Sequence, residues 1–332
     1  MPTVKQRFDN YYKRVRPKPG QLKLVKTELD LLERRLGGEF GQLEGFDFVK
    51  ALRSGSYPKQ TMVRRAKVGD FDADLGVYVS SSGSRPIDGL LNHVQSMVER
   101  VYASRTKRQP YIDRSAKSSI RVEFEDHPKI NIDIVPIIVL EHPKIANWGY
   151  IPRRDGERRP TSVTGHIEFV RERNKRKGAT DFHKLVTVLK WWRNHWADQQ
   201  LVEVFSSFAL SLVLARAFDD SELSGDWLED LLEVVSWVCR HRLLRPISFR
   251  VSNVPRATSV CNDEVQIFDP YNLDNNVAHE IRSSQREAIV ELFDRLADRL
   301  QDAQLEREHD EKDMCAVLDG GLYNFLTWSK AD

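Results

Sequence analysis

Two aspartates in the segment Phe71–Val79 constrain this chain more than any other feature. The other residues of the segment are apolar or β-forming, and polar and apolar positions alternate at its start, as in a strand with one buried face. Alternate strand residues point to the same side, so Asp72 and Asp74 lie next to each other while Ala73 and Leu75 face the core. Neighbouring carboxylates repel each other unless a cation lies between them, and oxygen ligands of this kind suit magnesium. The alternative is an exposed edge strand with two solvated acids.

A third aspartate is embedded in a later apolar segment, residues 130–137. A buried carboxylate without a partner costs several kcal/mol, so Asp133 needs a hydrogen-bond donor or a cation. If its strand lies beside that of Asp72 and Asp74, the three carboxylates form a site for two magnesium ions. Two such ions would activate an attacking hydroxyl and stabilise a leaving pyrophosphate. Asp70 has the parity of the first pair and is interpreted as a strand-entry or supporting residue.

A Gly-Ser pair opens the turn that follows a predicted strand at Phe46–Ser54. Gly55 would let the backbone approach a ligand closely, and Ser56 adds a hydroxyl and an N–H that suit a phosphate. Gly-Ser pairs are mostly plain turns, so this pair gains meaning only from the carboxylates that follow it.

The hydrophobic pattern of the first half predicts an α+β domain with a mixed sheet. The predicted helices are Gln21–Leu36, ended by Gly37-Gly38, and Pro86–Arg105. The predicted strands are Phe46–Ser54, Asp72–Val79, Ser118–Phe124 and Lys129–Leu140, the last two as a hairpin. We expect a catalytic domain over residues 1–165, including the N-terminal helix.

The second half predicts a mainly helical domain over residues 166–332. Its predicted helices are Asp181–Trp196, Ser207–Phe218, Trp227–His241 and Ser283–Leu305, with strands only at Ser248–Val251 and Val265–Phe268. A chain of 332 residues has room for about two domains. The catalytic site is expected in the cleft between them.

The charge balance limits where nucleic acid could bind. Lysines and arginines number 51 and acids 49, a net charge of +2, so any basic partner site must be local. The segment Arg153–Lys177 has such a local excess and is interpreted as a solvated linker, with RNA or substrate phosphates as the alternative partners.

The cysteines and the apolar runs predict a cytoplasmic protein with no membrane partner. Cys239, Cys261 and Cys315 lie far apart without metal-ligand spacing, so three free thiols in a reducing compartment are the simplest interpretation. The N-terminus lacks the apolar core of a secretory signal, and no apolar run approaches the length of a membrane helix.

Together these motifs resemble the nucleotidyltransferase superfamily of DNA polymerase β. Within it, the chain is similar to the branch of 2′-5′-oligoadenylate synthetase, cyclic GMP-AMP synthase and the bacterial CD-NTases of CBASS antiphage signalling. The resemblance spans most of residues 40–285. Its matching segments are Gly55–Thr61 (a Gly-Ser-x₄-Thr loop), Asp72–Val77 and Ile132–Pro136 (the metal strands), and Asp269–Val277 (Asp-Pro…Asn-Asn-Val). One departure is the spacing from Ser56 to Asp72, 16 positions, which is longer than in the animal enzymes because of the basic loop Arg64–Lys67.

The resemblance also implies two phosphate-binding residues in the second half. Leu189–Arg193 is similar to the family's Leu-Lys-x-Trp-Arg helix, so Lys190 would meet the donor triphosphate. Ser206–Leu210 is similar to the segment whose serine faces the phosphates, which makes Ser207 the candidate. The alternatives are a solvated helical lysine and a serine that caps its helix, respectively.

By resemblance, the chain is a metal-dependent nucleotidyltransferase that uses two Mg²⁺ ions, with Mn²⁺ as a substitute. It would make a cyclic di- or trinucleotide second messenger from ATP, alone or with other NTPs, and this product would act on a downstream effector. An RNA or protein activator is left open. The alternative functions are modification of RNA or protein, and non-catalytic sensing of nucleotide or RNA.

Overall fold

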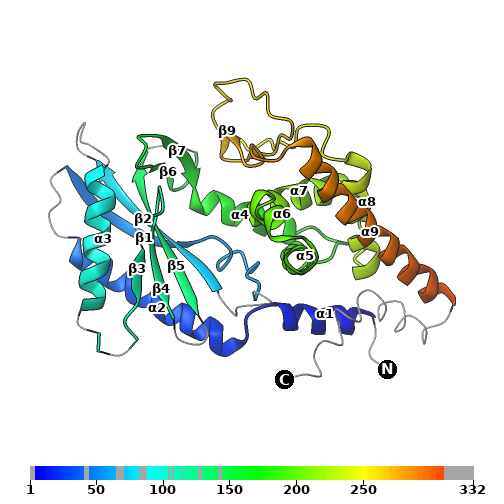
Figure 1. Ribbon diagram of the computed structural model, residues 1–332, viewed down its shortest axis with the longest axis horizontal. Coiled ribbons are helices and arrows are strands. Elements are labelled where there is room, and N and C mark those ends of the chain that lie inside the picture. The colour runs from blue at the N-terminus through cyan, green and yellow to red at the C-terminus, as the bar shows by residue number, and fades with distance from the viewer. Residues whose placement is uncertain are drawn as a thin grey trace.

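The computed structural model describes residues 4–40, 45–64, 71–81, 88–103, 105–106, 108–113, 115–125, 129–140 and 144–309. A unit built around a β-sheet comes from the first half of the chain, and a helical unit from the second half lies beside it (Figure 1). The expected supporting residue Asp70, the basic loop residues 65–67 and Cys315 lie outside the described residues.

The central sheet contains the strands that the sequence predicts and three further ones. They are β1 (Phe46–Ser54), β2 (Phe71–Ser81), β3 (Tyr111–Asp113), β4 (Ile120–Phe124), β5 (Ile130–Val139), β6 (Trp148–Pro152) and β7 (Arg158–Ser162). The order is β1-β2-β5-β4-β3, with β6 paired to β5 and β7 to β6. Only β2 and β5 run parallel, so the sheet is mixed, and β4 and β5 form the expected antiparallel pair.

Two helices cover one face of this sheet and enclose its core. They are α2 (Pro19–Glu39) and α3 (Asp88–Ala103), seen below and to the side of the strands in Figure 1. Helix α2 ends at Glu39, three residues past the expected end at Leu36, so both glycines lie in its last turn. A Cβ on Gly37 would lie 2.9 Å from the Phe48 ring, which shows that this glycine serves close packing of α2 on β1.

The sequence did not predict α1 (Val4–Val15) as a separate helix. Helix α1 leaves the sheet unit and lies under the helical unit (Figure 1), where Phe8 stacks on Trp227 with ring centroids 5.7 Å apart. Helix α1 therefore packs on the helical unit, whereas α2, which follows it, packs on the sheet.

The helical unit contains six helices and one small hairpin within the described residues. The helices are α4 (Val163–Asn174), α5 (Phe182–Trp196), α6 (Gln199–Val204), α7 (Ser207–Asp220), α8 (Trp227–His241) and α9 (Ser283–His309). The hairpin pairs β8 (Phe268–Asp269) with β9 (Asn272–Asn276). Apolar faces of α5, α7, α8 and α9 form one core. No helix among the described residues combines the length and the apolar character needed to cross a bilayer.

The strands expected at 248–251 and 265–268 are largely wrong. The chain forms an isolated bridge between Ile247 and Ile267 and the two-residue strand β8. The Asn276 side chain accepts a hydrogen bond from the Ile267 N–H and donates one to the Val265 carbonyl, at 2.8 and 2.7 Å. A side chain thus takes the place of a strand partner here.

The segment expected as a solvated linker is also ordered structure. It forms β7 and α4, and the Ser162 hydroxyl accepts a hydrogen bond from Gly165 N at 3.0 Å to begin the helix. Several of its basic side chains pair with acids, among them Lys175 with Glu172. The predicted domain boundary at residue 165 falls inside α4, which joins the two units.

Candidate active site

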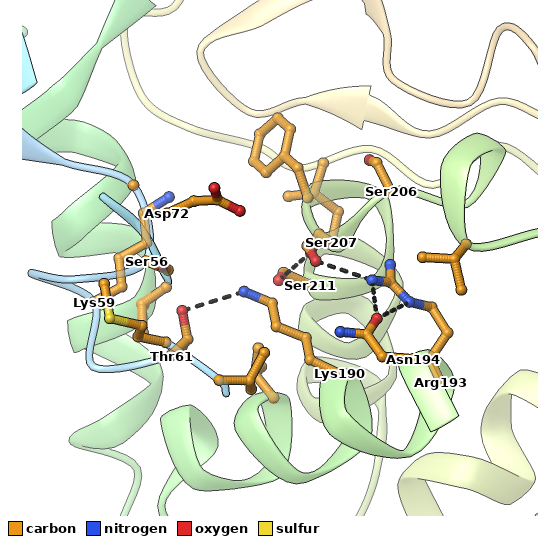
Figure 2. A pocket seen from close by; sticks show the side chains of 18 of the residues that line it. Ser56, Lys59, Thr61, Asp72, Lys190, Arg193, Asn194, Ser206, Ser207 and Ser211 are labelled. Carbon is orange, nitrogen blue, oxygen red and sulfur yellow. Dashed lines mark hydrogen bonds between the residues drawn. The ribbon is translucent and has the colours of Figure 1, made fainter. Parts of the chain in front are cut away.

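A cavity of about 950 Å³ lies between the sheet unit and the helical unit. Its walls come from the turn after β1, from β2, and from α4, α5, α6 and α7; Figure 2 shows the side chains that point into it. Six of the predicted site residues line it: Gly55, Ser56, Asp72, Asp74, Lys190 and Ser207. The seventh, Asp133, is not among its lining residues.

The three aspartates share one face of the sheet. Strands β2 and β5 pair in parallel with Asp74 opposite Asp133 and Asp72 opposite Asn131. Directly opposed residues of neighbouring strands point to the same side. The strand of Asp133 therefore lies beside that of Asp72 and Asp74, as a three-carboxylate site requires. The Asn131 amide donates a hydrogen bond to Asp72 Oδ1 at 3.1 Å. The Asp72 carboxylate points into the cavity (Figure 2).

Asp74 lies in an environment that disfavours its charged form. Burial, together with the negative charges of Asp133 and Asp72, raises its pKa to about 6 against the opposing effect of Lys59 and Lys190. Carboxylate oxygens gathered on one face of a sheet are the kind of ligand that a divalent cation such as Mg²⁺ prefers. The residues present therefore fit a metal site.

Asp133 is bound to a neighbour that the sequence argument missed. Arg121, directly opposite on β4, donates from Nε and Nη2 to the two oxygens of Asp133 at 2.9 and 2.8 Å. These hydrogen bonds raise the arginine pKa. Within the described part of the chain, no three His, Cys, Asp or Glu side chains converge as a ready cation cage. The third carboxylate is engaged by an arginine instead.

The backbone of Gly55 lies directly against the carboxylate of Asp74. Its φ is +65°, and a Cβ built on it would lie 1.7 Å from Asp74 Oδ2. The preceding Ser54 pairs with Asp74 across β1 and β2. The glycine is therefore required both by the backbone conformation and by its contact with the site.

The turn that begins at Gly55 is held by its own backbone. Thr61 N donates to the Ser56 carbonyl at 3.0 Å, and Gln60 N donates to the Tyr57 carbonyl at 3.1 Å. Just before the turn, Arg53 forms two hydrogen bonds to the Glu33 carboxylate of α2, at 2.9 and 2.8 Å. Helix α2 thus fixes the turn against the sheet.

Lys190 projects from α5 into the cavity and is buried. Its ammonium donates to Thr61 Oγ1 at 3.3 Å, which joins the helical unit to the turn (Figure 2). Burial lowers its pKa to about 7, and the charges of Lys59 and Arg193 act in the same direction. The interpretation as a solvated helical lysine is wrong.

Ser206, not Ser207, caps α7, since its hydroxyl accepts a hydrogen bond from Ala209 N at 3.1 Å. The Ser207 hydroxyl instead accepts from Arg193 Nη2 at 3.0 Å at the cavity wall (Figure 2). Burial lowers the pKa of this arginine to about 10. Capping is therefore not the role of Ser207.

Lys59 is a further cavity residue that the sequence argument passed over. It belongs to the same turn as Ser56, and its ammonium lies 5.7 Å from the centre of the Phe208 ring. Burial lowers its pKa, while Asp74 and Asp269 oppose this shift. Its position within the Gly-Ser turn was the available signal. Lys59, Lys190 and Arg193 together place three cationic groups around one cavity.

The Asp-Pro…Asn-Asn-Val segment begins beside the same cavity. Asp269 accepts a hydrogen bond from Tyr271 N at 2.8 Å and lies 3.4 Å from Nε2 of His166, a cavity residue. Burial raises the pKa of Asp269 to about 6 and holds that of the histidine well below its usual value. A Cβ on Gly165 would lie 2.4 Å from the Tyr271 ring, so α4 and this segment are tightly packed.

Residues 1–174 match a family described as the Second Messenger Oligonucleotide or Dinucleotide Synthetase domain, SMODS. A "Cyclic AMP-AMP-AMP synthase" of Escherichia coli (strain MS 115-1) is 27% identical over 267 residues, 78% of each chain. A "CBASS oligonucleotide cyclase CdnC" of E. coli (strain KTE188) is 24% identical over 272 residues, 81% of this chain and 82% of that one.

Solved structures share the fold. The E. coli MS115-1 CdnC:HORMA-deltaN complex contains a chain that aligns with a TM-score of 0.72 and 23% identity, covering 94% of this chain and 95% of that one. The Vibrio cholerae cyclic AMP-GMP synthase DncV aligns with a TM-score of 0.65 and 13% identity, covering 90% and 91%. The expected α+β fold with a nucleotidyltransferase core and a helical second half is confirmed.

Proposed function

The chain belongs to the SMODS family of second messenger oligonucleotide or dinucleotide synthetases, and from this premise we propose how its cleft performs the reaction. A ribose hydroxyl of one nucleotide attacks the α-phosphate of an NTP, and pyrophosphate leaves. The observation that carries this proposal is one cavity with Asp72 and Asp74 on one wall and three cationic groups on the others. The carboxylates could hold metal ions that bind some of the oxygens of a triphosphate, and the cationic groups could bind its remaining oxygens.

The cationic side of the cavity positions the triphosphate. Lys190 and Lys59 contact phosphate oxygens as compact point charges, and Arg193 supports the hydroxyl of Ser207 at the same wall. Ser56 and the backbone of its turn complete the phosphate contacts. Within the described part of the chain, Lys190 and Arg193 donate hydrogen bonds to hydroxyl, amide and carbonyl oxygens and to no carboxylate, which leaves their charge available to a polyanion.

The carboxylate side holds the metal. Asp72 and Asp74 would bind both divalent ions and Asp133 the one nearest the nucleophile, with Mg²⁺ as the natural ion and Mn²⁺ as a substitute. When bound, such ions lower the pKa of the attacking hydroxyl and stabilise the leaving pyrophosphate. The donor set and the raised pKa of Asp74 support this assignment.

The product is a cyclic oligonucleotide, and we propose ATP as a substrate, in line with the relative named as a cyclic AMP-AMP-AMP synthase. The relative named as a CBASS cyclase supports a role in antiphage signalling through a downstream effector. The solved complex of a structural neighbour with HORMA-deltaN supports a protein partner for this chain. Free thiols at Cys239 and Cys261 support a cytoplasmic location.

Product analysis tests this function. Purified protein is incubated with radiolabelled ATP, CTP, GTP and UTP and Mg²⁺ or Mn²⁺, and then with phosphatase. A labelled, phosphatase-resistant product that comigrates with a cyclic standard is expected, and omitting each NTP in turn identifies the bases. Label transferred to added RNA or protein, with no resistant small product, would support a macromolecular acceptor. Nucleotide binding without any product, even after addition of cell lysate, would support a sensor.

Replacing Lys190 by methionine is expected to raise the KM for the donor NTP by about a hundredfold, since a charged hydrogen bond to a buried ammonium contributes up to about 3 kcal/mol. Lys190→Arg should restore part of this loss, because it keeps the charge without the compact shape. The control is Lys184→Met, on the same helix but paired with Asp9 and Asp181. Steady-state kinetics give the values, and an unchanged KM in Lys190→Met would remove this residue from the triphosphate site.

The low pKa of Lys190 predicts proton uptake on NTP binding. Below pH 7 the ammonium of the free enzyme is already charged, so binding takes up no proton there. Above pH 7 the amine is mostly neutral and must be protonated to meet the phosphates, so affinity falls by up to about tenfold per pH unit. Calorimetry at pH 8 in buffers of different ionisation enthalpy measures this uptake. It should vanish in Lys190→Met, and uptake that persists there would assign the proton to another group.

A further inference from the structure

We propose that Arg121 is an internal counter-ion of Asp133 that competes with a divalent cation for this carboxylate. The inference rests on the proposed metal role of Asp72, Asp74 and Asp133, and it adds a residue that controls when the third carboxylate is available. Arg121 thereby makes metal loading at Asp133 an exchange reaction rather than simple binding.

The contact between the two side chains is built into the sheet. Arg121 and Asp133 are directly opposed residues of the antiparallel strands β4 and β5, so their side chains leave the same face at the same level. Both ends of the guanidinium fork donate, Nε to Oδ1 at 2.9 Å and Nη2 to Oδ2 at 2.8 Å. Such two-pronged pairs are among the strongest side-chain contacts, and they engage both oxygens that a metal would use.

The charge of Arg121 also reaches the neighbouring ligand. The negative charges of Asp133 and Asp72 both raise the pKa of Arg121, whereas Lys59 and Lys190 act on Asp74. Lys59 and Lys190 therefore act on Asp74, whereas Arg121 acts on Asp133 and Asp72. The lysines line the cavity where a triphosphate would sit, and Arg121 faces the outer carboxylate of the set.

The Arg121 side chain has other partners when its ion pair with Asp133 is broken. This side chain is 36% exposed while that of Asp133 is 17% exposed, so a displaced guanidinium would be hydrated rather than left buried without a partner. Glu123 lies two residues further along β4, on the same face, and its charge already raises the pKa of Arg121. Displacement by a metal therefore leaves Arg121 with an alternative partner.

Binding of Mn²⁺ alone to the full-length, nucleotide-free protein tests the exchange, with free Mn²⁺ measured by electron paramagnetic resonance. Arg121→Gln should bind Mn²⁺ about tenfold more tightly than the wild type, because the cation no longer displaces an arginine. Arg121→Lys keeps the charge without the fork and should fall between the two. The control is Arg100→Gln, which removes an arginine of helix α3 that pairs with Glu39 of α2. This variant should leave the Mn²⁺ affinity unchanged.

Repeating the substitution in the Asp133→Asn variant separates competition for this carboxylate from a general effect of the arginine charge on the metal site. The carboxylate of Asp133 is absent there, so adding Arg121→Gln should change the Mn²⁺ affinity by less than about twofold. Equal tightening in both backgrounds would overturn the exchange. Equal affinity of wild type and Arg121→Gln would overturn the role of Arg121 and leave the metal site intact. Absence of Mn²⁺ binding from both would overturn the inference together with the metal site beneath it.

Discussion

Replacing Asp72 and Asp74 together by asparagine abolishes product formation, with an expected loss of at least about a thousandfold in rate. The amides keep the size of the side chains but remove the negative charges that a divalent cation needs. The charge stabilisation supplied by such ions amounts to several kcal/mol, and each 1.36 kcal/mol corresponds to a tenfold change in rate. The measurement is formation of phosphatase-resistant product at saturating NTP.

A misfolded protein would give the same loss, so stability is measured beside activity. Thermal unfolding of the double variant without metal should occur at the wild-type temperature or above it, because the burial and repulsion that raise the pKa of Asp74 disfavour its charged form. Asp47→Asn on the adjacent strand β1, an exposed position, is the matched control and should keep full activity. Substantial activity in the folded double variant would contradict the assignment of these carboxylates.

Replacing Gly55 by alanine is expected to lower the rate by at least about a hundredfold. The new methyl group would start 1.7 Å from Asp74 Oδ2, so the carboxylate or the turn must move. Displacement of a reacting group by about 1 Å can cost about a hundredfold. The positive φ of +65° adds about 1–2 kcal/mol of backbone strain. Thermal melting and steady-state kinetics of the same preparation give both effects.

Gly178 offers a control that separates strain from contact. Its φ is +71°, but nothing lies within 4 Å of a Cβ built on it. Gly178→Ala should therefore lose a similar amount of backbone energy and keep its catalytic rate. If Gly55→Ala were no more damaged in rate than Gly178→Ala, the close approach of this glycine to Asp74 would have no catalytic meaning.

The sequence by itself predicted the strands of the site and the side to which their acids point. Alternation in Phe71–Val79 placed Ala73 and Leu75 in the core, where both are fully buried, and left the aspartates on the opposite face. The embedded charge of Asp133 required a partner in any fold. Such inferences succeed because strand periodicity and the cost of a buried charge are local properties of the chain.

Helix α2 and the start of α7 show where local rules were insufficient. The pair Gly37-Gly38 predicts a helix end at Leu36, but both glycines are helical, the helix ends at Glu39, and Gly37 lies against the ring of Phe48, a residue of β1. Either Ser206 or Ser207 could cap α7 by residue type, and only the helix start assigns the cap to Ser206. Competing local signals were resolved by packing.

Only the tertiary structure identified the partners of the site residues. The sequence does not specify Arg121 as the partner of Asp133 or Thr61 as the partner of Lys190, because the first contact depends on the exact register of two strands and the second on how the two units meet. The lowered pKa of Lys190 likewise follows from burial between those units. Sequence determined which residues can do the chemistry, because residue type and period are carried by the chain itself. Their partners and charge states depend on distances that exist only after the sheet and the helical unit have closed around the cavity.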